Sequence, residues 1–221
     1  MPEAPPNIRA VLFDYGLVLT GPPDPAAWLQ LKQICVSEEA AFHAAYWRYR
    51  HDYDRGALNS ITYWQAVTRE LDPKPRRELS PARIDQLRAA DTALWTQPNQ
   101  PMIDWAARLQ RAGIRTGILS NLGDAMEDGV RAHCAWLAAF THHTFSHRLG
   151  IAKPEAAIYL HAAAGLAVPP QQILFIDDRE DNIAAARAVG MYAVQYTDHP
   201  SFLETMTSSG FAALLDPPAQ Q

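Results

Sequence analysis

Short apolar runs alternate with amphipathic segments in two separate parts of the chain. The first run covers residues 10–13, and later ones cover residues 116–119, 173–176 and 192–194, with a shorter strand expected at 144–145. Helical spacing of apolar residues between the later runs predicts helices at 102–112, 124–138, 155–165 and 182–189. Repeated strand–helix units are typical of a doubly wound parallel sheet with helices on both faces. We therefore predict an α/β fold with the first strand at the centre of the sheet.

The segment between these two parts has a different pattern. Helical periodicity without a β-rich run extends from residue 26 to about residue 95 and predicts helices at 26–31, 38–53, 60–71 and 81–94, with Ser60 and Ser80 as N-caps. Proline-rich stretches at 21–25 and 97–101 flank the segment and are interpreted as hinges, because proline cannot extend a helix or a strand. We therefore expect an all-helical cap domain at residues 22–97, inserted into a core domain made of residues 1–21 and 98–221.

Composition narrows the class of protein. The 221 residues are 48% hydrophobic, which is enough to form such a core and its insert. The net charge of −5 has no block of like charges, so we expect neither a nucleic-acid partner nor an anionic membrane surface. No apolar stretch approaches the roughly 18 residues that a membrane span needs, and the first ten residues lack a signal-peptide pattern. We expect a cytoplasmic protein; the sequence leaves its oligomeric state open.

The cysteines and histidines show no metal-ligand pattern. Cys35 and Cys134 are too few for a disulfide framework, and we expect both to be reduced and buried. His142, His143 and His147 lie close together in the sequence, but no matching cysteines or acids accompany them. A loop with partly exposed histidines is the preferred interpretation of that cluster.

Acidic residues follow two of the predicted strands. Asp14 comes directly after the first strand, and Asp177 and Asp178 come directly after the strand at 173–176. The carboxyl ends of parallel strands meet at one edge of a sheet, so these three carboxylates should converge. Three carboxylates at such short distances cannot all stay ionised unless a cation lies between them. Carboxylate oxygens are ligands that Mg²⁺ prefers. If Asp14 were isolated, we would interpret it as the cap of a turn. Because it is expected beside the acid pair, we prefer to interpret it as a nucleophile that forms an aspartyl-phosphate.

Polar side chains suited to a phosphoryl group lie in the other loops. Ser120 and Asn121 follow a predicted strand and precede a helix, where they can cap the helix and also bind phosphate oxygens. Lys153 precedes Pro154. It could be an ordinary surface lysine in contact with solvent, which is the usual position of lysine. With acids expected nearby, its ammonium would instead neutralise charge on the transferring group. Asn182 is expected to begin a helix and to orient Asp178.

These four segments, in this order, resemble the four motifs of the haloacid dehalogenase-like (HAD) hydrolase superfamily. The resemblance covers roughly residues 9–200, with the helical insert where that family carries its cap. Each motif alone is weak, whereas four in register are specific. The resemblance, which extends to the sugar-phosphatase-like branch, implies a Rossmann-like core, a Mg²⁺ ion and an aspartyl-phosphate intermediate.

The resemblance also implies a role for each motif residue. It assigns the metal to Asp14, the backbone carbonyl of Gly16 and Asp178, and the phosphate to Ser120, Asn121 and Lys153. Catalysis falls to Asp14 as the nucleophile and to Lys153, which Asp177 would anchor. The function this implies is a Mg²⁺-dependent phosphatase of a small phosphorylated metabolite.

Gly16 departs from the family pattern. Phosphatases of this family usually place a second aspartate two residues after the nucleophile, as general acid and base, and such groups contribute about 100- to 10,000-fold in rate. Substrates with a stable leaving group, such as anomeric sugar phosphates or acyl phosphates, would not need that acid. Some sugar phosphatases of the family also carry glycine here, which favours this interpretation.

Three competing interpretations of Gly16 stay open. The cap could supply a substitute acid from the cluster Tyr46, Arg50, His51, Tyr53, Asp54 and Arg55, with His51 or Asp54 as the candidates. The protein could instead be a catalytically silent module that binds phosphorylated ligands. A 2-haloacid dehalogenase also lacks the second acid, but it does not need the Asp177–Asp178 pair, so a dehalogenase is less favoured.

Overall fold

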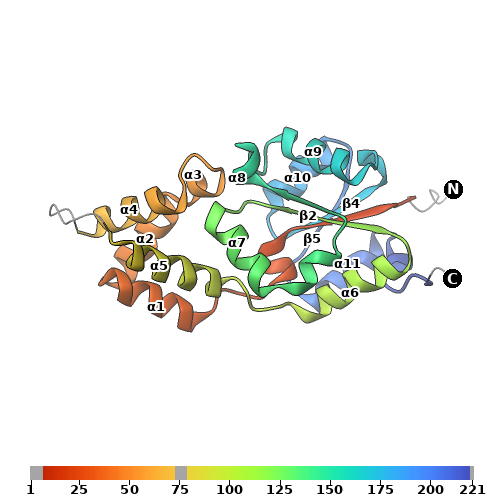
Figure 1. The fold of residues 1–221 in the computed structure, drawn as a ribbon. Helices are drawn as coiled ribbons and strands as arrows, with labels where there is room; N and C mark the ends of the chain where they lie inside the picture. The colour runs from red at the N-terminus through yellow and green to blue at the C-terminus, as the bar shows by residue number, and fades with distance from the viewer. Residues whose placement is uncertain (1–6, 73–78, 220–221) are drawn as a thin grey trace.

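The computed structural model describes residues 7–72 and 79–219. Within them, five parallel strands form one sheet in the order β3-β2-β1-β4-β5 (Figure 1). The central strand is β1 (Ala10–Phe13), and the others are β2 (Arg115–Ser120), β3 (His142–Phe145), β4 (Ile173–Asp177) and β5 (Tyr192–Gln195). The predicted parallel sheet with its first strand at the centre is therefore confirmed.

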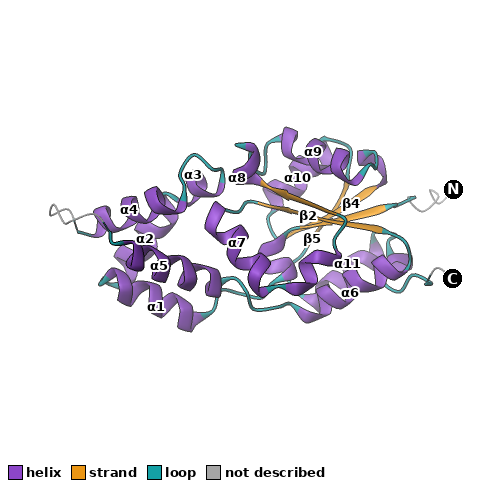
Figure 2. Cartoon of the chain, viewed as in Figure 1, coloured by secondary structure: helices purple, strands orange, loops and turns teal. Residues whose placement is uncertain are grey.

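Helices cover both faces of the sheet (Figure 2). One face carries α9 (Ala156–Leu166) and α10 (Glu180–Ala188), and the other carries α6 (Gln100–Arg111) and α11 (His199–Ser208). The side chains of β1 alternate between two hydrophobic clusters, with Val11 and Phe13 in one and Ala10 and Leu12 in the other. Because β1 is buried on both faces, its carboxyl end is a rigid place for a functional side chain.

A separate layer of helices lies beyond the carboxyl ends of the strands (Figure 1). It consists of α1 (Pro25–Cys35), α2 (Glu39–Arg48), α3 (Arg50–Asp54), α4 (Ser60–Leu71) and α5 (Pro81–Leu94), which we call the cap. The chain enters and leaves the cap side by side, because Thr20 forms an antiparallel bridge with Pro98 and the Gly21 N–H donates to the Gln97 carbonyl at 2.8 Å. The predicted helical insert is confirmed, whereas the boundaries 22 and 97 stay a prediction.

The ends of several helices differ from the prediction. The expected single helix 38–53 is two helices that meet at Tyr49, and the expected helix 124–138 is α7 (Asp124–His133) followed by a 3₁₀ turn. Ser80 caps α5 as predicted, accepting from the Arg83 N–H. Ser60 is not a cap. Asn59 caps α4 in a reciprocal pairing with Thr62, and Ser60 begins the helix and bonds to the core instead.

The histidine and cysteine predictions are wrong in part. His142 and His143 are not in a loop; they pair with β2 as the first residues of β3, and the ring of His143 stacks on Phe145. Cys134 is buried, but Cys35 is only half-buried, and both thiols are free. None of the described helices is both long enough and apolar enough to cross a membrane.

Candidate active site

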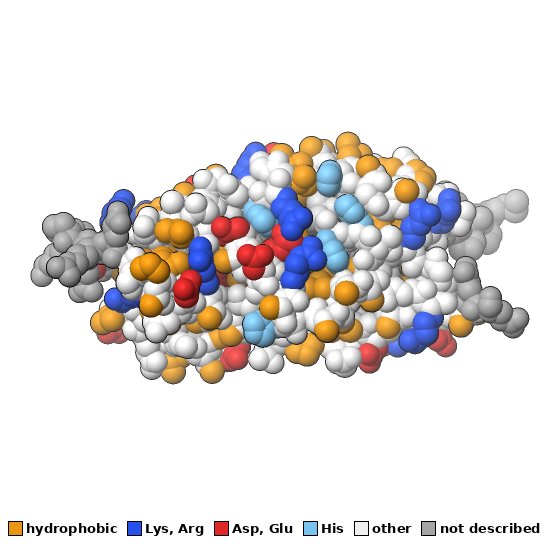
Figure 3. Space-filling model, viewed as in Figure 1, with side chains coloured by type: hydrophobic (Ala, Val, Ile, Leu, Met, Phe, Trp, Pro, Cys, Tyr) orange, Lys and Arg blue, Asp and Glu red, His pale blue; other side chains and the backbone are white. Residues whose placement is uncertain are grey.

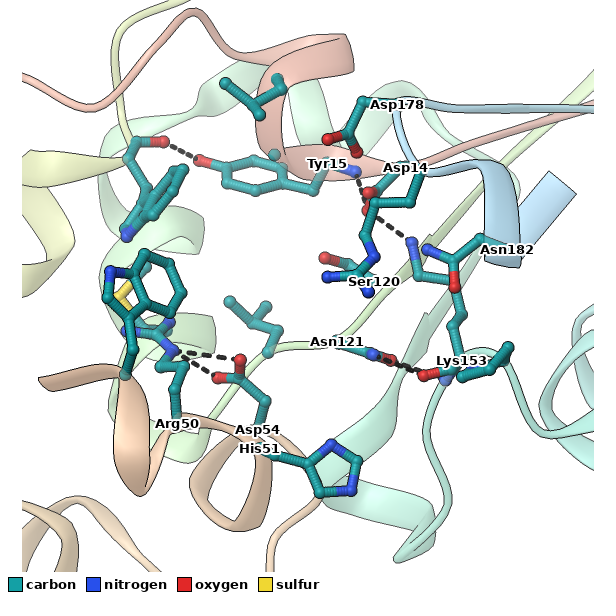
Figure 4. Close-up of a pocket in the computed structure, with 18 residues that line it drawn as sticks. Asp14, Tyr15, Arg50, His51, Asp54, Ser120, Asn121, Lys153, Asp178 and Asn182 are labelled. Atoms are coloured by element: carbon teal, nitrogen blue, oxygen red, sulfur yellow. Dashed lines mark hydrogen bonds and ion pairs between the residues drawn. The ribbon is translucent and has the colours of Figure 1, made fainter. Parts of the chain in front are cut away.

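Asp14 lies at the carboxyl end of β1, facing the cap (Figure 4). Its backbone N–H donates to the Ile176 carbonyl at 2.8 Å, which continues the pairing of β1 with β4. Its side-chain Oδ1 accepts from the Tyr15 N–H at 2.7 Å. The chain then leaves the strand through an irregular turn, Tyr15–Leu19, in which Leu17 has a φ of 60°. The Asp14 carboxylate is thus held where a buried strand ends.

Lys153 joins the carboxylates at the ends of β1 and β4. Its Nζ lies 2.8 Å from Asp14 Oδ1 and 2.6 Å from Asp177 Oδ2, and the residue is only 4% exposed. Burial alone would lower the pKa of Lys153, but the two carboxylates outweigh this effect and raise it. The ammonium therefore stays charged in the interior.

Asp177 is held on both of its oxygens. Oδ2 accepts from Lys153, while Oδ1 accepts from the Arg179 N–H at 2.9 Å and from the Asn182 amide at 2.8 Å. Asn182 was expected to orient Asp178, but its amide is directed at Asp177. The reason is that Asn182 lies in the first turn of α10, directly beside the end of β4. Asp177 therefore anchors Lys153 and is itself anchored by α10.

Three carboxylates converge at this edge of the sheet. Asp14, Asp177 and Asp178 each offer one oxygen, and these oxygens lie within 4.8 Å of one another. Burial raises the pKa of Asp14 to about 7, against the lowering effect of Lys153, and burial also raises the pKa of Asp178. One ammonium faces three acids, so a divalent cation would relieve the remaining repulsion. Because Asp177 is already engaged, Asp14 and Asp178 are the carboxylates that fit a hard cation such as Mg²⁺.

Asn121 connects the loop after β2 to the loop that carries Lys153. Its carboxamide donates to the Lys153 carbonyl at 2.9 Å and accepts from the Lys153 N–H at 2.8 Å. Ser120, the last residue of β2, is buried and lines the same cavity as Asp14. The structure brings both residues to the site, and their contact with phosphate stays a prediction. Sequence reasoning missed the clamp on Lys153, because nothing in the local pattern links positions 32 residues apart.

The chain is similar to known proteins over most of its length. The model of the haloacid dehalogenase-like hydrolase family matches residues 8–190. The chain belongs to the haloacid dehalogenase-like hydrolases. Bifunctional epoxide hydrolase 2 from Sus scrofa is 28% identical over 224 aligned residues, which cover 96% of this chain and 40% of that protein. Its counterpart from Rattus norvegicus is 31% identical over 112 residues, or 49% of this chain and 20% of that protein. The chain thus spans less than half the length of these relatives.

Solved structures show the same fold. A HAD family enzyme from Bacteroides thetaiotaomicron has a TM-score of 0.70 and 18% identity, over 90% of this chain and 98% of that one. The same enzyme in complex with magnesium and inorganic phosphate has a TM-score of 0.67 and 20% identity, over 86% and 94% of the two chains. L-2-haloacid dehalogenase from Xanthobacter autotrophicus has a TM-score of 0.61 and 18% identity, over 94% and 86%. At these identities the similarity establishes the HAD fold and leaves the substrate open.

This hydrolase has Gly16 at the position of the usual second aspartate. The backbone conformation of Gly16 does not require a glycine. Its φ of −66° and ψ of 136° are open to any residue. A Cβ built at this position would come no closer than 4.0 Å to the ring of Trp95. The missing carboxyl group is therefore a feature of the sequence that the fold does not impose.

A cavity of about 500 Å³ lies between the carboxyl ends of the core strands and the cap. Its core side carries the motif residues, and its cap side is lined by Trp47, Arg50, His51, Asp54 and Trp95. Figure 4 places Arg50, His51 and Asp54 on the wall opposite Asp14. In the space-filling view, charged and histidine side chains gather near the middle of the face, over α7 and the neighbouring part of the core (Figure 3). The sequence singled out Arg50, His51 and Asp54 as a cap cluster, but Trp95 follows the end of α5 without any motif that would mark it.

Proposed function

We propose that this HAD-like hydrolase is a Mg²⁺-dependent phosphatase of a small phosphorylated metabolite. The proposal rests on the meeting of Asp14, Asp178 and Lys153 at the carboxyl ends of neighbouring strands, with the acid oxygens within 4.8 Å of one another. The Bacteroides thetaiotaomicron enzyme, which shares the fold, has been solved with magnesium and inorganic phosphate. That complex supports the same pair of ligands here.

Asp14 acts as the nucleophile in this proposal. Among the described residues its side chain contacts Tyr15 and Lys153, both through Oδ1, so Oδ2 can attack phosphorus. The bond from phosphorus to the leaving-group oxygen breaks as the bond to Asp14 forms. Water then hydrolyses the aspartyl-phosphate, which releases inorganic phosphate and restores the carboxylate. Lys153 and the hydroxyl of Ser120 would bind the non-bridging oxygens, and a bound Mg²⁺ would add the positive charge that lets a carboxylate approach a phosphate dianion.

Gly16 sets the expected choice of substrate. Without an acid at this position, the leaving oxygen departs without a proton from the usual donor. We therefore propose substrates whose leaving group is already stable, with sugar 1-phosphates and acyl phosphates as examples. His51 and Asp54 lie on the far wall of the cavity (Figure 4), where they suit contact with the remote end of a substrate better than protonation of the leaving oxygen.

A paired assay tests the function. Hydrolysis of an aryl phosphate and of an alkyl phosphate is measured with and without Mg²⁺, for the wild type and for Asp14→Asn. We expect Mg²⁺-dependent hydrolysis that is much faster for the aryl ester, and no turnover by Asp14→Asn with its circular dichroism spectrum unchanged. Phosphate binding without hydrolysis of either ester would support a silent binding protein. Halide release from a 2-haloacid would support a dehalogenase, and equal rates on the two esters would contradict the role given to Gly16.

A further inference from the structure

Arg50 is a buried cation with a fixed orientation in the cap. It begins α3 and is only 7% exposed. Its Nε donates to both carboxylate oxygens of Asp54, at 2.8 and 3.0 Å, and its Nη1 donates to Asp91 at 3.2 Å and to the hydroxyl of Tyr46. Contacts from several cap helices therefore hold the plane of the guanidinium, so it cannot turn away to follow a different partner.

The third nitrogen of this guanidinium has no partner among the described residues. The hydrogen bonds that Arg50 makes with them use Nε and Nη1, and none uses Nη2. Arg50 lines the cavity, as does Asp54 beside it. Nη2 is not a buried donor without a partner, so it keeps accessible surface, and a ligand in the cavity that Arg50 lines can supply its acceptor in place of water.

The cavity has polar side chains at two ends and is also lined by apolar side chains. The motif residues around Asp14 form one end, and Arg50 and Asp54 form the opposite end (Figure 4). Side chains of Leu17, Trp47, Trp95 and Met126 also line it. A ligand that spans the cavity would therefore have a phosphate at one end, a body that packs on apolar and aromatic surface, and a hydrogen-bonding group at the other end.

The charges around Arg50 and Asp54 determine which kind of ligand group can bind at this end of the cavity. One guanidinium lies against two carboxylates, Asp54 and Asp91, so the cluster has no positive charge left for a second anion. Both oxygens of Asp54 accept from Arg50 Nε, which fits an ionised carboxylate that can also accept from a hydroxyl. Burial raises the pKa of Asp54 to about 6, although Arg50 lowers it. A hydroxyl can accept from Arg50 Nη2 and donate to Asp54 at once, which neither an anion nor an alkyl group can do.

We propose that Arg50 and Asp54 form a specificity site for a neutral hydroxyl group at the end of the substrate remote from the phosphate. This inference rests on the proposed function, because the phosphate must occupy the motif end of the cavity. Arg50 and Asp54 bind and orient the substrate and take no part in the transfer of the phosphoryl group.

Binding of two phosphonates tests the proposal without turnover. Benzylphosphonate and 4-(hydroxymethyl)benzylphosphonate differ by one hydroxymethyl group at the far end, and their dissociation constants are measured by calorimetry in the presence of Mg²⁺. We expect the wild type to bind the hydroxylated compound about 10-fold more tightly or better, as a hydrogen bond to a charged group implies. Arg50→Lys keeps the charge but loses the planar fork, and Asp54→Asn loses the acceptor. Each variant should bind the two compounds with nearly equal affinity.

Arg48→Lys is the matched control. Arg48 lies two residues away, is exposed, and pairs with Glu70 outside the cavity, so this variant should keep the wild-type preference. Equal binding of the two compounds by the wild type, or a preference that survives in both Arg50→Lys and Asp54→Asn, overturns the specificity site. Hydrolysis of aryl phosphates separates the two proposals: a preference for the hydroxyl without any turnover supports the site and contradicts the phosphatase, and turnover without a preference does the reverse.

Discussion

Individual residues of the site could be predicted where the main chain alone determines their position. Asp14 and Asp177 end buried strands, so the strand pattern was enough to bring their carboxylates together. The partners of Asn121 and Asn182 could not be predicted in this way. The side chain of Asn121 forms hydrogen bonds with the backbone of Lys153, and the side chain of Asn182 donates to Asp177. These contacts depend on how the loops and helices pack against the sheet.

Restoring an acid at position 16 should widen the choice of substrate. The backbone of Gly16 accepts any residue, and a Cβ there meets only ordinary contacts, so Gly16→Asp should fold normally. A carboxyl group at this position could protonate a poor leaving group, so we expect kcat/KM for an alkyl phosphate to rise by about 10-fold or more. The rate for an aryl phosphate should change less. Steady-state kinetics with both esters make the comparison.

The control for this substitution is Gly16→Ala, which adds the Cβ without the acid. It should leave the ratio of the two rates as it is in the wild type. An equal gain in Gly16→Ala would show that the effect comes from the backbone or from packing, and would contradict the acid role.

At the scale of elements, the strands and most helices follow from the apolar pattern, whereas their ends do not. The break between α2 and α3 accompanies the burial of Arg50, a charged residue whose place among Asp54 and Asp91 cannot be read from an apolar period. Asn59 caps α4, and Ser60 does not. Asparagine and serine are both good N-caps, so the residue types alone could not decide between these two neighbouring positions.

The packing of α5 against α7 depends on a glycine. A Cβ at Gly129 would lie 2.2 Å from Thr92 Oγ1 and 2.4 Å from Thr92 Cγ2. Gly129→Ala should therefore lower the free energy of unfolding by about 1 to 3 kcal/mol, although alanine favours a helix. Urea unfolding measures the change. Thr92→Ala removes both atoms but keeps the Thr92 Cβ, which would lie 2.8 Å from the new Cβ. The double variant should therefore recover part of the loss, and a double variant that is simply the sum of the two single variants would contradict this contact.

A buried carboxylate connects α7 to α8 (Ser146–Leu149). Glu127 is only 2% exposed and accepts from Arg131, His147 and Arg148 at 2.6 to 2.8 Å. Burial alone would raise the pKa of Glu127, but these hydrogen bonds outweigh it and lower the pKa to about 2. Because the pKa is lower in the folded protein, Glu127 stabilises the fold above about pH 4.5, and this contribution disappears as the pH falls towards 2.

Glu127→Gln tests this pH dependence. At pH 6 we expect the variant to be less stable than the wild type by about 1 to 3 kcal/mol in urea unfolding. The gap should narrow as the pH falls from 5 to 3. A gap that stays constant over that range would show that the ionised carboxylate is not the stabilising form.

At the scale of the whole molecule, the division into a sheet core and a helical cap could be predicted, but their close approach could not. Gly56, Gly123 and Gly129 lie where a Cβ would meet His147, Tyr53 and Thr92 across the junction between cap and core, at 2.2 to 2.5 Å. Polar contacts add to this packing, with Ser60 bonded to Asp124 and Arg55 paired with Glu155. The size of the cavity depends on these approaches, which no local pattern predicts.

Magnesium should stabilise the whole molecule if it binds between Asp14 and Asp178. A ligand that binds only the folded state at 100 times its dissociation constant adds about 2.7 kcal/mol to the free energy of unfolding. We therefore expect the melting temperature to rise by several degrees when Mg²⁺ is added to the metal-free protein. Asp178→Asn removes one of the two carboxylates and should lose most of this rise. The same rise in both proteins would place the ion elsewhere.

The role of Asp14 as nucleophile is tested most directly by trapping the covalent intermediate. The enzyme is mixed with an aryl phosphate and Mg²⁺, quenched with acid within milliseconds, digested and analysed by mass spectrometry. We expect one phosphoryl group on the peptide that contains Asp14, and none on that peptide when Mg²⁺ is omitted or when the Asp14→Asn variant is used. Rapid hydrolysis of the ester with that peptide unmodified at every quench time, or a phosphoryl group on another residue, would contradict the mechanism.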